Sequence, residues 1–244
     1  MPGAEVKAFH TRVLRLTLAV QESRAYWEAV DPQMQGTPRI ERAFNERWFG
    51  SKSLARVKLL LANFAHRFDA YPEALDTLRR WRPTDPGTRP LLCHWHLQLS
   101  DPLYRTFTGD WLWARRDEGR REFDTDIVAR WLATLPNAEW APSTRFQFAT
   151  KLLRAADEAG LISGAKDGPR TLLTPRIPDE ALGYLVRRLQ QISHPGTWRD
   201  NPYFRSVGLC EEGLEARLGR LPEVQYRRMG DLVELETRPV GALQ

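Results

Sequence analysis

The sequence predicts a mainly α-helical protein with two short β-hairpins in its second half. Apolar residues recur at steps of three and four in most segments, a spacing that gives a helix one apolar face. Ser, Asp and Pro stand where these segments begin, and Gly and Pro stand where they end. Hydrophobic residues make up 42% of the 244 residues and charged residues 27%, as in a soluble globular protein with a substantial core.

The first 81 residues predict four helices. The first is expected over 5–30, because its apolar residues fall on one face: Val6, Phe9, Val13, Leu16 and Val20. A short helix around 39–48 follows the break made by Pro and Gly. The next helix runs through 54–68, with Ser51 or Ser53 as its cap. Pro72 then precedes another short helix.

A loop and two further helices are expected in the middle of the chain. The composition of residues 82–90, RPTDPGTRP, is typical of a loop, and LLCHWHLQLS after it predicts a buried helix. The following helix starts with Ser100 or Asp101 as its cap and with Pro102 in its first turn, where the missing N–H costs nothing. Gly119 ends this helix.

The segment after residue 120 predicts a winged helix. Asp124 or Thr125 caps one helix, Ser143 caps the next, and Gly160 ends the latter. The stretches LIS and TLLT then flank the turn GAKDGP and predict a hairpin. Two helices, a short link and a hairpin are the order of a winged helix. This order favours a helix that enters a DNA groove with a β-wing beside it, although an ordinary packed unit fits the same pattern.

The C-terminal part repeats the order of helix and hairpin. Helices are expected over 178–192 and 211–218, and VQYRRMGDLVELET predicts a hairpin that turns at Gly230 and Asp231. The two units are too dissimilar in sequence to be a repeat. We therefore expect two domains: a helical, basic one over residues 1–120 and a winged-helix-like one over 121–244 that ends in the hairpin.

Several classes of protein are disfavoured by composition. Cys93 and Cys210 lie far apart and form no disulfide framework. No apolar run approaches the roughly 18 residues of a membrane span, and the N-terminus has no apolar signal core. These observations predict a cytoplasmic protein that does not bind a membrane.

The net charge of +5 is concentrated near the N-terminus. Residues 1–90 hold 15 Lys or Arg against 10 Asp or Glu, whereas residues 91–244 hold 21 of each. The segment 39–68 holds seven Lys or Arg against two Asp or Glu, so its net charge equals that of the whole chain. Such a concentration of positive charge suits binding to a polyanion. A helix face exposed to solvent is the plainer interpretation. Six of its side chains are candidates for DNA phosphates: Arg39, Arg42, Arg47, Lys52, Arg56 and Lys58.

The helix that follows Ser143 supplies a second candidate set. Its apolar face is expected to pack inward, and its solvent face carries side chains that reach phosphates and base edges. These are Ser143, Thr144, Arg145, Gln147, Lys151 and Arg154, with Lys166 and Arg170 on the wing. Asp157 and Glu158 are expected at the far end of the helix, away from any groove. Alternatively, Arg145 or Arg154 pairs with these acids along the helix, and the unit serves only as a protein docking module.

Sites for catalysis are scarce. Cys93, His94 and His96 form a dense cluster, but it lacks the fourth ligand and the partner motif that a zinc site needs. Buried histidines with satisfied hydrogen bonds are the simpler interpretation. The chain has no GxSxG, P-loop or GxGxxG motif. We therefore expect no enzyme activity, no cofactor and no metal.

Five stretches within about residues 39–235 share their order and character with a known family. They are FNERWFGSKSLARVKLLLANFAHRF, DPLYRTFTGDWLWARRDEG, FDTDIVARWLATLP, STRFQFATKLLRAADEAGLI and LTPRIPDEALGYLVRRL. In these stretches the sequence resembles the BrxA family of bacterial phage-exclusion (BREX) systems. The resemblance implies a mostly helical, non-enzymatic DNA-binding protein whose N-terminal part is similar to the antitermination factor NusB. It also implies partners in the same defence system: a methyltransferase, an ATPase and a phosphatase-like protein.

Two classes of function remain open on the sequence. The first is a module that binds double-stranded DNA in a phage-defence complex, mainly through phosphates; NusB-like folds also bind RNA. The second is an interaction protein that joins larger partners without contacting nucleic acid. Salt-dependent binding and its loss in the double variant Arg47→Glu, Lys52→Glu are expected only for the first class.

Overall fold

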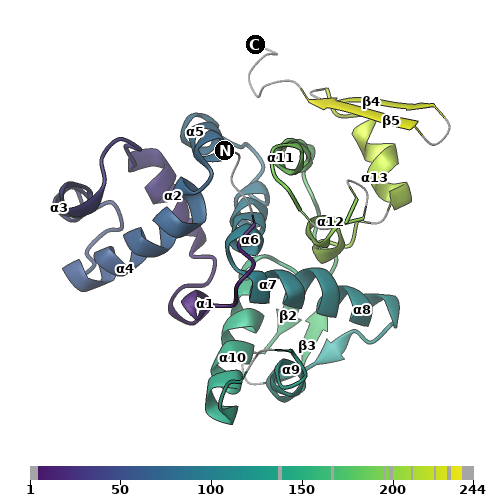
Figure 1. The fold of residues 1–244 in the computed structure, drawn as a ribbon, viewed down its shortest axis with the longest axis horizontal. Helices are drawn as coiled ribbons and strands as arrows, with labels where there is room; N and C mark the ends of the chain where they lie inside the picture. The colour runs from purple at the N-terminus through teal and green to yellow at the C-terminus, as the bar shows by residue number, and fades with distance from the viewer. Residues whose placement is uncertain are drawn as a thin grey trace.

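A computed structural model describes residues 5–136, 139–165, 168–194, 196–197, 200–209, 211–222, 224–229 and 232–237. Helices dominate these residues, and the strands are few and short (Figure 1). The mainly α-helical class that the sequence predicts is therefore confirmed.

The N-terminal segment does not form the single helix that its apolar spacing predicts. Two helices, α1 (Arg12–Arg15) and α2 (Val20–Ala29), are separated by an extended stretch that ends at Ala19 with φ of 49°. The Arg67 guanidinium donates to the Thr17 and Leu18 carbonyls, both at 2.9 Å. The Glu158 carboxylate accepts from the Leu18 N–H at 2.8 Å. The stretch stays extended because the side chains of Arg67 and Glu158 form hydrogen bonds with backbone C=O and N–H groups that would otherwise pair within a helix.

The next helices pack around a cluster of aromatic rings. They are α3 (Gly36–Asn45), α4 (Leu54–Phe64) and the π-helical turn η1 (Ala65–Asp69) that continues α4. Ser53 is the cap of α4, since its hydroxyl accepts from the Arg56 N–H. The rings of Phe64 and Phe68 are fully buried against Tyr26 of α2.

The central helix of the molecule is α6 (Thr88–Ser100), which follows α5 (Pro72–Arg80) (Figure 1). Every residue from 91 to 100 is buried, as the composition predicts. The helix begins inside the predicted loop, because the Glu180 carboxylate accepts from the Thr88 hydroxyl at 2.6 Å and from the Asp85 N–H at 2.9 Å.

A second helical run follows at once. It comprises α7 (Pro102–Thr106), the π-helical turn η2 (Phe107–Trp111) and α8 (Leu112–Asp117). Asp101 is its cap, since the carboxylate accepts from the Tyr104 N–H at 3.0 Å. Gly119 follows with φ of 70°, the left-handed conformation that ends a helix.

A small sheet and two helices come next. Their order is β1 (Glu122–Phe123), α9 (Thr125–Leu132), α10 (Pro142–Glu158), β2 (Ile162–Gly164) and β3 (Arg170–Leu172). The three strands are antiparallel in the order β1-β3-β2.

The caps of these two helices differ from each other. Asp124 caps α9 by accepting from the Ile127 N–H at 2.8 Å. Ser143, however, is not the cap of α10: the N-cap position is Ala141, no side chain accepts there, and Pro142 fills the first turn. Gly160 follows α10 with φ of 72°, as predicted.

The C-terminal elements are α11 (Asp179–Gln190), α12 (Pro202–Ser206), α13 (Glu211–Leu218) and the antiparallel strands β4 (Val224–Met229) and β5 (Leu232–Thr237). Among them, α11 packs against α6, and α12 packs against α7, η2 and α8. The predicted turn at Gly230 and Asp231 lies outside the described residues. Across the predicted boundary near residue 120, α10 contacts α1 and α6, and buried residues of both halves form a continuous hydrophobic core.

Candidate nucleic-acid interface

Helix α10 has one buried and one exposed face. Phe148 is fully buried, and its ring centroid lies 4.3 Å from that of Trp140. Leu152, Ala155 and Ala156 continue the buried face. The opposite face is open to solvent or lines grooves, and it carries Ser143, Phe146, Gln147, Thr150, Lys151 and Arg154. The periodicity of α10 therefore orients this helix as the sequence predicts.

The predicted candidate set on α10 is only partly on this face. Arg145 and Thr144 are half-buried. Arg145 precedes Arg154 by nine residues, which is two and a half turns at about 100° per residue, so the two project in opposite directions. Arg145 consequently does not belong to the exposed face.

The two wing residues have different outcomes. Lys166 lies outside the described residues. Arg170 is 7% exposed, its guanidinium donates to the Gly164 carbonyl at 2.8 Å, and it lies 3.9 Å from the Asp157 carboxylate. Arg170 therefore links β2 and β3, and its burial leaves the guanidinium largely unavailable to DNA.

One groove lies between α10 and the β2–β3 pair. It has a volume of about 550 Å³. Its charged lining residues are the cations Lys151, Arg154 and Arg170 and the acid Asp157. Its lining residues are Thr125, Thr150, Lys151, Leu153, Arg154, Asp157, Gly164 and Arg170.

A second groove lies on the other flank of α10, against the N-terminal helices. It has a volume of about 370 Å³ and shares Lys151 and Arg154 with the first groove. Arg15 of α1 and Arg56 of α4 line it too, so basic side chains from three helices meet here. We call this second groove, with its four cations Arg15, Arg56, Lys151 and Arg154, the basic groove. Within the described part of the chain, Arg15, Arg56 and Lys151 have no carboxylate within 4.0 Å.

The acids of the basic groove are engaged in internal contacts. Glu158 accepts from the Thr17 hydroxyl at 2.9 Å, from the Leu18 N–H at 2.8 Å and from Arg154 Nε at 2.9 Å. Glu22 lies 3.3 Å from Lys52 Nζ. The expected pairing of Arg154 along the helix is thus confirmed. Asp157 and Glu158 lie at the C-terminal end of α10, as predicted, where Asp157 lines the first groove of the protein surface and Glu158 lines the second.

Arg39 does not face solvent as the sequence predicts. Its side chain is 6% exposed and forms an ion pair with Asp69, and it also donates to the Tyr26 hydroxyl at 2.9 Å. Burial, followed by the charge of Asp69, raises the pKa of Tyr26 above its usual value. Arg39 is a structural cation that links α2, α3 and η1, and it is not available to a phosphate.

The remaining basic residues of the N-terminal segment divide into two groups. Arg42 pairs with Glu46 at 2.9 Å on α3, and the exposed Arg47 follows with φ of 54°. Hydrogen bonds from Trp48 and Arg42 lower the pKa of Glu46. Figure 1 shows α3 at the end of the molecule away from α10. Arg56 lines the basic groove instead, and Lys58 is exposed on the same helix.

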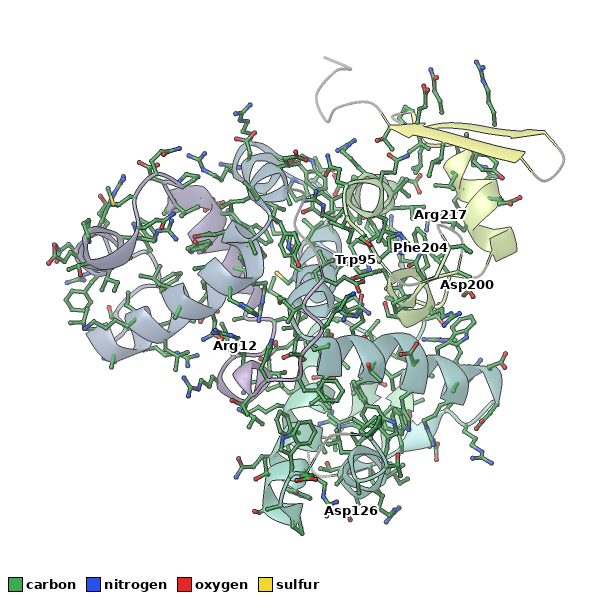
Figure 2. All side chains as sticks on the ribbon, in the orientation of Figure 1. Arg12, Trp95, Asp126, Asp200, Phe204 and Arg217 are labelled. Carbon is green, nitrogen blue, oxygen red and sulfur yellow. The ribbon has the colours of Figure 1, made fainter. Side chains whose placement is uncertain are left out.

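Arg15 is the groove residue that the sequence does not reveal. Arg15 is the last residue of α1, and Arg12 is the first. Figure 2 shows Arg12 beside α1, away from Trp95 at the centre of the molecule. The spacing of the helix predicts only that Arg15 points away from the apolar face. Its approach to α10 depends on the break at residues 16–19.

The Cys–His cluster of α6 is an element of the core. His94 lies between the hydroxyls of Tyr104 at 2.8 Å and Ser206 at 2.9 Å, and His96 Nε2 is 2.6 Å from the Tyr184 hydroxyl. Burial lowers the pKa of both histidines to about 3 and raises that of Cys93 to about 12. No group of three His, Cys, Asp or Glu able to hold a metal occurs among the described residues. Satisfied buried histidines are confirmed.

The described helices include none that combines the length and the apolar character needed to cross a membrane.

Comparison with known proteins identifies a related fold. No protein-family model and no curated protein matches the chain. A solved structure, that of an uncharacterized protein from Magnetospirillum magneticum, superposes with a TM-score of 0.62 at 16% sequence identity. The match covers 82% of this chain and 98% of the other. At this identity the likeness shows that the two chains share a fold.

Proposed function

We propose that the protein binds double-stranded DNA without catalysing a reaction, and that α10 is its recognition helix. The arrangement β1–α9–α10–β2–β3 after α8, with strand order β1-β3-β2, supports a winged-helix interpretation of this segment. In such a unit the exposed face of α10 enters the major groove and the β2–β3 turn lies beside it.

The observation that carries the proposal is the basic groove. Arg15, Arg56, Lys151 and Arg154 come from three helices, yet they line one surface that is continuous with the exposed face of α10. Lys and Arg bind phosphates and release counterions, which supplies affinity that does not depend on sequence. Glu158 pairs with Arg154 and Glu22 with Lys52, so three of the four groove cations, Arg15, Arg56 and Lys151, have no carboxylate within 4.0 Å among the described residues.

The resemblance to BrxA extends the proposal to a cellular role. We infer a cytoplasmic component of a phage-defence system that acts beside a methyltransferase, an ATPase and a phosphatase-like protein. The N-terminal helices would then be the NusB-like part, and they bring Arg15 and Arg56 to the DNA-binding face.

Fluorescence anisotropy of a labelled random duplex at several salt concentrations tests this proposal. We expect affinity that falls with salt, with a slope near −0.9 per phosphate contacted. An unlabelled single-stranded RNA of equal length is the competitor that separates DNA from RNA binding. Absence of binding at the lowest salt concentration contradicts the proposal.

A specific observation favours a protein-binding role as the second candidate. Phe44 of α3 and Leu54 at the start of α4 are each 41% exposed, and α3 packs against α4. Exposed apolar side chains that form a contiguous patch mark protein contacts. Co-purification with a neighbouring protein that is lost in Phe44→Asp, while DNA binding is unchanged, would assign that role to this pair of helices.

A further inference from the structure

The exposed face of α10 carries a large apolar side chain that the fold does not use. Phe146 is 50% exposed, whereas Phe148, two residues later, is fully buried. Phe146 therefore contributes little to the core. Its neighbours on the exposed face are Ser143, Gln147 and Thr150.

The first half of α10 presents an unusual set of groups. Its solvent face presents the hydroxyls of Ser143 and of the half-buried Thr150, one phenyl ring and one amide, and the first cation on this face is Lys151. Arg145 lies on the opposite side of the helix. The first acid of the helix is Asp157, so a phosphate backbone meets no repulsion over this half.

These groups match one kind of base pair. In the major groove, Arg and Lys select guanine, Gln pairs with the N6 and N7 edge of adenine, and apolar side chains contact the methyl group of thymine. Ser and Thr hydrogen-bond to either kind of pair and do not discriminate. The first half of the exposed face thus holds both kinds of side chain that select A·T, whereas the cations that can select G·C, Lys151 and Arg154, follow only in the second half.

We propose that α10 reads A·T pairs in the major groove, with Phe146 against the thymine 5-methyl group and Gln147 on adenine. This inference rests on the proposed DNA-binding function and deepens it. Adjacent residues project about 100° apart on a helix, so Phe146 and Gln147 point to neighbouring parts of the groove floor. Lys151 and Arg154 follow on the same face at the level of the phosphates.

The test measures how much the 5-methyl group of thymine contributes to binding. Anisotropy at fixed salt compares a duplex of A·T pairs with the same duplex in which deoxyuridine replaces every thymidine, which deletes only the 5-methyl group. A G·C duplex of equal length measures the overall preference. The proteins are the full chain, Phe146→Ala and Phe44→Ala, the last as a matched exposed phenylalanine on α3.

We expect the full chain to bind the thymidine duplex about fourfold more tightly than the deoxyuridine duplex, the effect of burying one methyl group. This ratio falls to one in Phe146→Ala and stays near four in Phe44→Ala. The A·T duplex is bound more tightly than the G·C duplex, and Gln147→Ala reduces that preference while the thymidine ratio remains.

Three results would overturn the inference, and each has its own meaning. Equal affinity of the full chain for the thymidine and deoxyuridine duplexes rejects the role of Phe146 and leaves DNA binding intact. Failure to bind any of the three duplexes rejects the proposed function itself. A thymidine ratio that persists in Phe146→Ala also rejects the role of Phe146, because the methyl group then has another contact.

Discussion

The Glu158 carboxylate, at the end of α10, accepts a hydrogen bond of 2.8 Å from the Leu18 N–H, which lies 140 residues earlier in the chain. The same carboxylate accepts from the Thr17 hydroxyl at 2.9 Å, while Arg67 holds the carbonyls of both residues from the other side. Residues 17 and 18 are thus held by hydrogen bonds to two charged side chains, Arg67 and Glu158. This relationship positions α1, and with it Arg15, against the proposed recognition helix.

Loss of the Glu158 carboxylate is expected to destabilise the protein. Glu158→Ala leaves the Leu18 N–H and the Thr17 hydroxyl without their charged acceptor, and an unsatisfied group of this kind costs about 1–3 kcal/mol. The free energy of unfolding from urea titration measures the change. Glu28→Ala is the matched control, since the Glu28 carboxylate is exposed and pairs with Arg24, and we expect a change below about 0.5 kcal/mol. Equal losses in the two variants would contradict this role of Glu158.

Charge reversal separates the two basic surfaces. The double variant Arg56→Glu, Lys151→Glu is expected to lose at least about tenfold in affinity for a random duplex and to reduce the salt slope by about two, because two phosphate contacts disappear. The control variant Arg42→Glu, Arg47→Glu has the same change in net charge, placed on α3 and just after its end. We expect its affinity to remain within about threefold of that of the unaltered protein. A larger loss in the α3 variant would move the phosphate-binding surface to the N-terminal end.

Gly109 is required by close packing and not by its backbone conformation. A Cβ added there would lie 2.4 Å from the Pro202 Cβ and 2.8 Å from its carbonyl oxygen, so η2 and α12 would have to separate. We expect Gly109→Ala to lower the free energy of unfolding by about 1–3 kcal/mol. Gly219→Ala, where the nearest atom is 4.0 Å away, is the control and should change it by less than about 0.5 kcal/mol. Thermal and urea unfolding of both variants measure the difference.

Stability is expected to fall below neutral pH because two histidines are buried in neutral form. Burial lowers the pKa of His94 and His96 to about 3, below the unfolded value of 6.5, so the unfolded chain binds more protons between these limits. The contribution of each is complete above pH 6.5 and is lost as the pH falls toward 3. At pH 5 each should cost about 2 kcal/mol relative to pH 7.5.

The variant His96→Gln tests the assignment of this pH dependence. It removes one titrating group, so the difference in unfolding free energy between pH 7.5 and pH 5 should shrink by about 2 kcal/mol, whatever the absolute stability of the variant. An unchanged difference would mean that other groups dominate the acid sensitivity. Urea titrations at the two pH values give both numbers.

The boundaries that the sequence predicts well are those set by neighbours in the chain. Ser53, Asp101 and Asp124 each accept from a backbone N–H three residues later, and such a bond is encoded locally. The buried and exposed faces of α10 are also local, because a helical period alone places Phe148 inward and Gln147 outward. The mainly α-helical class, the hairpin after α10 and the burial of His94 and His96 follow from signals of this range.

The sequence by itself therefore determined the helical class, most of the helices and the faces of single helices, since these depend on residues a few positions apart. The tertiary structure alone decided which charges meet. It buried Arg39 against Asp69, turned Arg170 into a strand contact and brought Arg15 and Arg56 to α10. The break at residues 16–19 depends on Arg67 and Glu158, and partners so far away in sequence leave no periodic signal. Long-range ion pairs and hydrogen bonds form only once the chain is packed, so they lie beyond any reading of local pattern.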